Sequence, residues 1–384
     1  MRIGIEAQRL QRPHKHGMDR VALELIKNLQ VIDKENDYFI FVKPDEDRKV
    51  ISNTSNFTVV EISGESYPVW EQFKLPKVAK SYQCDVLHCT SNTAPIFTNI
   101  PLIITIHDVI YMEGTLSKLL GSSASSYQKF GNLYRRMIVK NVVNTSKKII
   151  TVSNYEKENI RNCFRLAEHQ IKTVHNGVSN QFLQDLDPEH VQKVKESCNL
   201  PDNYVFHIAN KDPRKNTKRI LKAFQKFLRN ENMDLKLVML GCKDADLKVL
   251  LKEINATDVY KNIVLPGYVS DMDLPIMYQL AEVFLFPSLK EGFGIPIIEA
   301  MASKVPVITS NISAMPEVAG RAAHLVDPYS VDEIYNGIVQ ITSNEQYKKE
   351  LIEKGSLQYK NFSWNTMATQ VLEQYNQLFE AKKK

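Results

Sequence analysis

The sequence has little that would cross-link the chain or anchor it in a bilayer. Its five cysteines, at positions 84, 89, 163, 198 and 242, are scattered, and no pair has Cys-x-x-Cys spacing. This pattern predicts neither a disulfide framework nor a zinc site and favours a reducing, cytoplasmic location. No apolar run approaches the roughly 20 residues that span a bilayer, and residues 1–7 have the pattern of a strand rather than of a signal peptide. We expect a cytoplasmic chain that is soluble or at most peripheral to a membrane.

Motifs for several kinds of ligand are also missing. No Gly-x-Gly-x-x-Gly follows the first expected strand, which argues against a dinucleotide oxidoreductase. No cluster of histidines and cysteines is spaced to hold a metal. There is no known nucleic-acid motif and no stripe of basic and aromatic residues. We expect no metal cofactor and no nucleic-acid partner.

The charge is unevenly distributed along the chain. Residues 1–180 hold 24 basic and 18 acidic residues, whereas the remainder holds 25 and 26. A basic first half would attract an anionic lipid surface or a lipid-diphosphate acceptor. The alternative interpretation is a solvated surface of lysines with no partner.

The length of 384 residues suggests about two domains. Short apolar runs alternate with helical patterns, which predicts an α/β chain of two doubly wound, Rossmann-like domains. The expected strands are Arg2–Glu6, Tyr38–Val42, Thr58–Ile62, Val86–Cys89, Leu102–Ile106, Lys148–Val152, Ile171–Val174, Tyr204–Ala209, Lys236–Leu240, Ile263–Leu265, Val283–Phe286, Val305–Thr309 and Ala323–Val326. The main expected helices are Asp19–Leu29, Ser125–Asn144, Thr217–Leu228, Ile295–Ser303 and Trp364–Phe379.

The polar stretch 179–203, which contains two prolines, best suits a connection between domains. We therefore expect an N-terminal domain over 1–178, a linker over 179–203, a C-terminal domain over 204–360 and a final helical segment over 361–384. Capping boxes at Ser153–Glu156 and Ser330–Glu333 predict two helix starts.

The most informative stretch is Glu291-Gly-Phe-Gly-Ile-Pro-Ile-Ile-Glu299. It follows an expected strand and opens an expected helix with proline in the first turn. Glycines let a backbone approach a ligand, and the free N–H groups of a helix start favour a phosphate. The two glutamates would accept hydroxyl groups on either side of that phosphate, as in a nucleotide-diphosphate sugar. The alternative is a βα turn with two incidental acids.

This stretch closely resembles the signature of retaining glycosyltransferases of family 4, and residues 310–320 resemble the segment that follows it in that family. The resemblance covers most of the chain and is strongest over 204–328. It implies the GT-B fold, in which two Rossmann-like domains face each other across a cleft and the last helix returns to the first domain.

The resemblance also implies roles for residues of the second half. Glu291 would bind hydroxyls of the transferred sugar, Phe293 and Gly294 would offer backbone N–H groups, and Glu299 would hold the ribose. Lys211-Asp-Pro-Arg-Lys-Asn216 resembles the Pro-Arg-Lys-Asn element of the family, so Arg214 and Lys215 would neutralise the donor diphosphate. Two cations at a helix start oppose its dipole, and an anionic ligand would relieve that conflict. Asn216 is expected to cap the following helix.

In the first half, Ile104-Thr-Ile-His-Asp108 resembles the His-Asp element of the family. His107 would touch the transferred sugar, and Asp108 would orient a sugar or acceptor hydroxyl. His16-Gly17 stands where the family has a glycine-rich loop, whose backbone N–H groups would approach the diphosphate or the acceptor. Only one glycine remains here, so Gly17 and Arg20 are weaker candidates for that contact. His88 is placed either near the acceptor or in the core.

The resemblance implies transfer of a hexose, with retention at the anomeric carbon and no metal. The motifs look most like bacterial-type mannosyltransferases of polysaccharide assembly, with GDP-mannose as the favoured donor and UDP-hexoses next. The acceptor would be a glycan or a lipid-linked glycan at the cytoplasmic face of a membrane. A nucleotide-sugar-binding protein without transfer activity remains an alternative.

Overall fold

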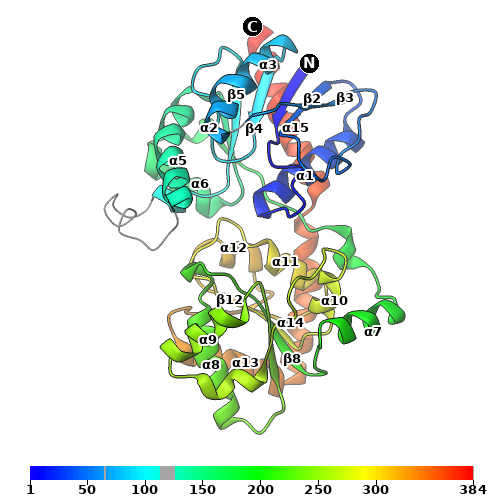
Figure 1. Cartoon of the computed structure of the whole chain (residues 1–384), viewed down its shortest axis with the longest axis vertical. Coiled ribbons are helices and arrows are strands. Elements are labelled where there is room, and N and C mark those ends of the chain that lie inside the picture. The colour runs from blue at the N-terminus through cyan, green and yellow to red at the C-terminus, as the bar shows by residue number, and fades with distance from the viewer. Residues whose placement is uncertain (65, 113–125, 384) are drawn as a thin grey trace. The chain divides into compact units, whose positions relative to one another are not determined.

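Two compact units make up the chain (Figure 1). The first comprises Met1–Asn176 and Trp364–Lys384, and the second comprises Gly177–Ser363. The computed structural model describes residues 1–64, 66–112 and 126–383. The polypeptide passes between the units twice, at 176–177 and at 363–364.

The first unit is built on a seven-stranded parallel sheet in the order β3-β2-β1-β4-β5-β6-β7. Its strands are runs of β-branched and aromatic residues, and helices cover the sheet, as parallel sheets require. The strands are β1 Arg2–Glu6, β2 Asp37–Val42, β3 Phe57–Glu61, β4 Val86–Cys89, β5 Leu102–Ile106, β6 Lys148–Thr151 and β7 Ile171–Thr173. The helices are α1 Gly17–Ile32, α2 Tyr67–Val69, the π-helix η1 Trp70–Lys74, α3 Leu75–Ser81, η2 Ile110–Met112, α5 Ser126–Thr145, α6 Asn154–Phe164, η3 Glu168–Gln170 and α15 Trp364–Lys383.

The second unit is built on a six-stranded parallel sheet in the order β10-β9-β8-β11-β12-β13. The strands are β8 Tyr204–Ile208, β9 Lys236–Leu240, β10 Ile263–Val264, β11 Val283–Phe286, β12 Val307–Ser310 and β13 His324–Val326. The helices are η4 Asn180–Leu183, α7 Pro188–Ser197, η5 Pro213–Lys215, α8 Thr217–Asn230, α9 Asp244–Glu253, η6 Thr257–Asn262, α10 Leu274–Gln279, α11 Ile295–Ala302, α12 Met315–Ala319, α13 Val331–Ser343, α14 Glu345–Gln358 and η7 Tyr359–Asn361.

Both sheets have the strand order of a doubly wound fold. In each, the chain first builds outward in one direction and then returns to build in the other, so the order reverses beside the central strand. The reversal lies between β1 and β4 in the first sheet and between β8 and β11 in the second. Ligands of such sheets bind at the carboxyl ends of the strands next to this point.

The helix α15 completes the first unit, although it comes last in the sequence (Figure 1). It packs along α1, and its buried Met367, Val371 and Tyr375 face the core. The Tyr375 hydroxyl lies 2.7 Å from Nδ1 of His88, whose Nε2 lies 2.8 Å from the Thr105 hydroxyl. Burial lowers the pKa of His88 to about 3, so this histidine is a neutral core residue. The interpretation of His88 as an acceptor contact is therefore wrong.

Most expected strands and helices are present within two or three residues of their predicted bounds. The largest shift among the strands is at β12, because Pro306 has no N–H to donate and Lys304 has a positive φ of 60°. The expected helix start at Ser125 lies outside the described residues. Both predicted serine caps are present, with Ser153 accepting from Glu156 N and Ser330 from Glu333 N.

The stretch 179–203, expected as a linker, is part of the second unit and contains η4 and α7. Asp187 caps α7 by accepting from the N–H groups of Glu189 and His190. Nε2 of His190 lies 2.7 Å from Asp273, which joins α7 to the start of α10. Local polarity suggested a connection, whereas these caps and contacts order the segment.

Candidate active site

An ion pair between Lys215 and Glu291 lies at the carboxyl edge of the second sheet. Lys215 Nζ is 2.8 Å from Glu291 Oε1, and the side chains are only 19% and 16% exposed. The two residues are 76 positions apart and follow β8 and β11, the two strands on either side of the reversal. Lys215 Nζ also lies 4.8 Å from the centre of the Phe286 ring at the end of β11. The structure thus brings together two residues that the sequence assigned to one donor site.

Asn216 fixes the position of Lys215. Its backbone is left-handed, with φ 61°, a conformation that asparagine tolerates better than most residues. Its Nδ2 donates to the carbonyl oxygens of Pro287 at 2.9 Å and Pro328 at 2.7 Å. Asn216 occupies the predicted N-cap position of α8, but its side chain makes no capping bond to that helix. Asn216 instead joins three loops at the carboxyl edge of the sheet.

The loop that carries Glu291 is held by Ser313. The Ser313 hydroxyl accepts from Glu291 N at 3.2 Å and donates to Glu291 O at 2.9 Å. At the end of the loop, Gly294 has φ 103° and ψ 51°, which leads directly into α11. A side chain is strained in that conformation, so glycine is needed at this position.

Arg214 lies beside Lys215 but has an acidic partner of its own. Its Nε and Nη2 donate to Asp212 Oδ2 at 2.8 and 2.6 Å. Asp212 also accepts from Arg214 N at 3.0 Å, and its hydrogen bonds with Arg214 help hold the pKa of its carboxyl below the usual value against the opposing effect of burial. Leu289 N donates to Arg214 O at 2.7 Å, which joins this turn to the segment before Glu291. Arg214 and Lys215 are thus each ion-paired with an acid of the second unit, Asp212 and Glu291.

The remaining predicted donor residues lie on or just before α11. Phe293 is buried, with its ring 5.5 Å from the ring of Phe362 in a T-shaped arrangement. Glu299 is 9% exposed, and its Oε2 accepts from the Tyr278 hydroxyl at 3.1 Å. Tyr278 therefore orients the carboxylate that the family resemblance assigns to ribose.

Sequence reasoning missed His207, a buried histidine of β8 behind the ion pair. Its Nδ1 lies 2.9 Å from the Leu285 carbonyl, and its Nε2 lies 3.2 Å from the Thr217 hydroxyl at the start of α8. Burial lowers its pKa to about 4, and the nearby Lys215 charge adds to this effect. A neutral His207 thus ties two strands to the helix that follows Lys215. Only its place one residue before the end of β8 could have indicated this role.

In the first unit, His107 directly follows β5. Its Nε2 lies 2.9 Å from the Thr90 carbonyl, and its backbone N donates to Asn92 Oδ1 at 2.7 Å. Because a carbonyl can only accept, Nε2 carries the proton in the neutral ring and Nδ1 is left as an acceptor. Burial lowers the pKa of His107, although the Thr90 bond and the nearby Asp108 and Asp19 oppose that shift.

Gly17 begins α1, and its neighbourhood converges on His107. Asp19 Oδ2 accepts from His16 N at 3.0 Å, which fixes the start of α1, and its charge also acts on His107. A side-chain carbon added at Gly17 would meet nothing within 4 Å, and Gly17 is not among the glycines with positive φ. The structure therefore shows no steric need for glycine at this position. Arg20, on the same helix, donates its backbone N–H to His16 O.

Asp108 follows His107 and faces a buried acid that sequence reasoning missed. Asp108 Oδ1 accepts from Ile110 N at 3.1 Å. Glu156, in the first turn of α6, accepts from Val109 N at 3.3 Å. Burial raises the pKa of Glu156 to about 8, and the Asp108 charge adds to the rise. Its position inside a capping box suggested only a helix start.

Asp-x-Asp pairs at 45–47, 185–187, 244–246 and 271–273 raise the question of a metal. Within residues 1–64, 66–112 and 126–383, no group of three or more histidine, cysteine, aspartate or glutamate side chains could hold one. Asp244 engages Lys248 and Tyr260, Asp246 engages Lys211, and Asp273 engages Ser270.

Each half of the chain matches a family model. Residues 16–182 match the model described as Glycosyltransferase Family 4, and residues 189–358 match the one described as Glycosyl transferases group 1. The chain belongs to glycosyltransferase family 4. The family resemblance predicted from the sequence is thereby confirmed.

Several curated relatives of this family 4 chain are bacterial mannosyltransferases. The O-antigen chain mannosyltransferase B of Escherichia coli is 31% identical over 236 residues, which are 62% of this chain and 62% of that protein. The serotype-specific mannosyltransferase WbdA of Escherichia coli is 26% identical over 61% of this chain and 29% of its own length. The O-antigen chain mannosyltransferase RfbU of Salmonella typhimurium is 27% identical over 73% of this chain and 70% of its own. The family 4 chain thus spans less than two thirds of the first two relatives.

Solved structures share the fold of the whole family 4 chain. Sucrose-phosphate synthase from Thermosynechococcus elongatus has a TM-score of 0.75 at 18% identity and covers 99% of this chain and 100% of its own. HepE from Anabaena, in complex with UDP and glucose, has a TM-score of 0.73 at 16% identity and covers 98% of this chain and 99% of its own. The predicted fold class of two Rossmann-like, parallel-sheet domains is confirmed. Among the described residues, no helix has the length and apolar character needed to cross a membrane.

Proposed function

We propose that this chain transfers a hexose, with mannose favoured, from a nucleotide-diphosphate sugar to a glycan or lipid-linked acceptor in polysaccharide biosynthesis. The observation that carries the proposal is the Lys215–Glu291 ion pair at the reversal point of the second sheet. The Lys215 cation suits the diphosphate of a sugar nucleotide, and the neighbouring Glu291 carboxylate suits the hydroxyls of its sugar. The mannosyltransferase relatives favour mannose, and the complex of HepE with UDP and glucose supports a sugar nucleotide as donor.

The donor would bind to the second unit. Lys215 would leave part of its ion pair to contact the diphosphate, and the first turn of α11 would add its positive dipole end. Arg214, which is paired with Asp212, would add positive charge near the diphosphate. Glu291 would accept hydrogen bonds from sugar hydroxyls, and Phe293 and Gly294 would donate backbone N–H groups to the sugar. Glu299, oriented by Tyr278, would hold the ribose.

The acceptor side of the reaction would use the first unit. Neutral His107 donates its Nε2 proton to Thr90 O, so Nδ1 can accept a hydrogen bond from a sugar hydroxyl. Asp108, on the next residue, would orient a hydroxyl of the sugar or acceptor. Gly17 would allow a phosphate or acceptor to approach the start of α1.

The reaction would proceed with retention through an oxocarbenium-like state. The bond between the anomeric carbon and the diphosphate oxygen breaks, and a bond from the same face to the acceptor oxygen forms. The acceptor proton passes to the departing diphosphate oxygen, so no side chain needs to act as a covalent nucleophile. Lys215 would stabilise the negative charge that develops on the leaving group. We expect transfer to continue in EDTA.

A thermal-shift panel of GDP, UDP, ADP and their hexose derivatives tests the donor assignment. We expect a GDP sugar to stabilise the chain most, with UDP sugars as the alternative. Proton NMR of the product anomer then tests retention. Stabilisation by a sugar nucleotide without transfer or donor hydrolysis would instead show a binding protein. A trapped covalent sugar on Glu291 or Asp108 would overturn the front-face route.

We also propose that the chain works in the cytoplasm, peripheral to the inner face of the membrane. A lipid-linked acceptor would be presented at that surface. The charge excess of residues 1–180 supports attraction to anionic lipid.

A further inference from the structure

Exposed apolar side chains are concentrated on one part of the first unit. Among the described residues of this unit, seven large apolar side chains are exposed, and six of them lie on α2, η1, α5 and the loop after β4. Phe97 is 80% exposed, Phe73 67% and Met137 63%. We call these six the apolar patch: Val69, Phe73, Phe97, Phe130, Leu133 and Met137.

One side chain, Gln72 of η1, joins three of the four elements that carry the apolar patch: η1, α5 and the loop after β4. Its Nε2 donates to the Tyr134 hydroxyl of α5 at 2.8 Å and to Ala94 O at 3.0 Å, and its Oε1 accepts from Ile96 N at 2.9 Å. Phe73 and Phe97 are therefore direct chain neighbours of hydrogen-bonded residues. Figure 1 shows α5 beside the segment from α2 to α3, in agreement with these bonds.

The patch residues of α5 form a stripe next to Tyr134. Phe130, Leu133 and Met137 are spaced i, i+3 and i+7, which places them along one side of the helix. The opposite side of α5 carries the buried Val139 and Val143. The stripe is thus surplus to the core, and it borders η1 rather than the sheet.

The charges around the patch have one sign. Residues 126–145, which form α5, contain four basic residues and no acidic one, and residues 86–106 contain neither. Residues 66–81 contain three lysines, all exposed, and one acid, Glu71, which is fully buried. Exposed apolar side chains together with exposed lysines, with no exposed acid on the same segments, have the composition of an interfacial membrane surface.

We propose that the apolar patch, with Lys74, Lys77 and Lys140, docks the first unit on an anionic lipid surface. The phenylalanines would enter the headgroup region while the lysines remain at the lipid phosphates. This inference rests on the proposed function, because it locates the surface at which a lipid-linked acceptor would be met.

The docked segment is linked to the acceptor side of the candidate site. Glu71, the chain neighbour of Gln72, accepts from the Tyr67 and Thr93 hydroxyls at 2.6 and 2.5 Å and from the Tyr134 hydroxyl. Thr93 directly follows Asn92, whose side chain holds His107 N. A membrane bound at the patch would therefore lie against the same loop that positions His107.

Vesicle co-sedimentation tests the proposal, with the full chain and without donor. Binding is measured to phosphatidylcholine vesicles and to vesicles that also contain phosphatidylglycerol. We expect binding only to the anionic vesicles and a decrease as salt rises. The double variant Lys77→Gln/Lys140→Gln should bind less, by about fivefold for each charge removed. The variant Phe73→Ser/Phe97→Ser should bind about tenfold less or weaker still.

Matched controls lie on α1 of the same unit. Val31 is 69% exposed and Lys27 is also exposed, but neither lies on the patch. The variant Lys27→Gln/Val31→Ser should bind vesicles as the wild type does. Transfer to a water-soluble oligosaccharide should be unchanged in all these variants, so loss of vesicle binding and loss of the proposed activity are separate readouts.

Three results would overturn the proposal. The first is no binding to either vesicle, and the second is equal binding to neutral and anionic vesicles. The third is a concentration-dependent dimer that Phe73→Ser/Phe97→Ser abolishes, because the patch would then be a contact between copies of the chain. A control variant that binds as weakly as the patch variants would count against the assigned surface in the same way.

Discussion

Separating Lys215 from Glu291 tests the donor site directly. Lys215→Met should weaken binding of free GDP or UDP, because it removes the cation closest to the expected diphosphate. Glu291→Gln should act in the opposite direction on the free nucleotide. It removes the anion that competes for Lys215 at 2.8 Å, so nucleotide affinity should stay the same or rise. Both variants should lose transfer, because Glu291 is also needed for the sugar.

The burial of the pair sets the expected magnitudes. Side chains that are 19% and 16% exposed lie between a surface pair, worth about 0–1 kcal/mol, and a fully buried one, whose disruption costs about 3–5 kcal/mol. We expect each single variant to lose about 1–2 kcal/mol of unfolding free energy, with a coupling of similar size in the double variant. Loss of one group that stabilises the leaving group should lower kcat about 100- to 1000-fold.

The assays are urea unfolding, calorimetric titration with GDP and UDP, and steady-state transfer. A matched control is the pair Lys218–Glu253, which is 2.6 Å apart on α8 and α9 but 56% and 49% exposed. Lys218→Met should leave nucleotide binding and transfer unchanged. If Glu291→Gln weakens free nucleotide as strongly as Lys215→Met does, Glu291 does not compete for the lysine and the assignment fails. Wild-type turnover in either variant would remove that residue from the active site.

Three further perturbations have signs that the structure fixes. Asn216→Gly keeps the left-handed backbone but leaves two carbonyls without their donor, for a loss of about 1–3 kcal/mol of unfolding free energy. Asn216→Asp turns a carboxylate toward these carbonyls and should unfold at a still lower temperature. Equal melting temperatures of the two variants would refute the role of Nδ2 as the donor. Glu156, with a pKa raised to about 8, keeps a proton that the unfolded chain releases near pH 4.5. Wild-type stability should therefore fall from pH 5 to 8 relative to Glu156→Gln, by up to about 3–4 kcal/mol, and parallel melting curves across that range would contradict the burial. Tyr375→Phe removes the hydrogen-bond partner of buried His88 and should lower the urea midpoint by an amount equivalent to about 1–3 kcal/mol. A variant that unfolds at the same urea concentration as the wild type would disprove this.

The positions of the strands could be predicted from the sequence because they are short apolar runs between turn residues. Runs such as Ile103–Ile106 can be buried on both faces only in a covered parallel sheet. The order of strands and the reversal points could not be derived from these runs, since they depend on contacts across the chain. The family resemblance supplied that part.

The candidate site was predictable where a motif carried it. Lys215 and Glu291 were named separately from two motifs, and the structure adds that they contact each other. Asn216 was misjudged because the side-chain oxygen of an asparagine before a helix usually accepts from the first N–H groups of that helix. Here Oδ1 accepts from Arg219 Nη1 at 3.0 Å, and Nδ2 donates to two distant carbonyls. No motif marked Glu156 or His207 as residues of the site, and burial raises or lowers a pKa only after the fold has formed.

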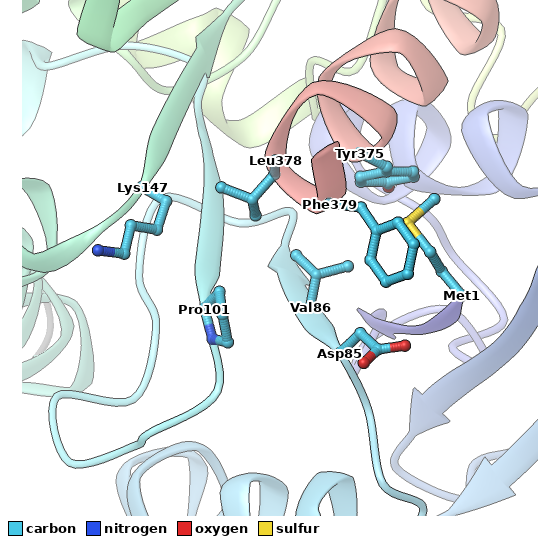
Figure 2. Close-up of a pocket in the computed structure, with 8 residues that line it drawn as sticks. All are labelled: Met1, Asp85, Val86, Pro101, Lys147, Tyr375, Leu378 and Phe379. Carbon is cyan, nitrogen blue, oxygen red and sulfur yellow. The ribbon is translucent and has the colours of Figure 1, made fainter. Parts of the chain in front are cut away.

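A cavity of about 270 Å³ in the first unit shows another limit of sequence reasoning. It lies at the amino ends of the strands, beside Asp85, Val86 and Pro101, and the side chains of Tyr375, Leu378 and Phe379 also line it (Figure 2). This edge is opposite to the one that holds His107. Only the return of α15 creates it, and no motif in the first half indicates it.

The double crossing of the chain between the units has a consequence for biosynthesis. Until residues 364–383 leave the ribosome, α1 and its neighbouring strands have no partner for the surface that Met367, Val371 and Tyr375 later bury. The second unit is one continuous segment of the chain, so it can fold before the first unit is complete. A released chain truncated before Trp364 should therefore expose this apolar surface and bind chaperones, while its second unit is already protease-resistant.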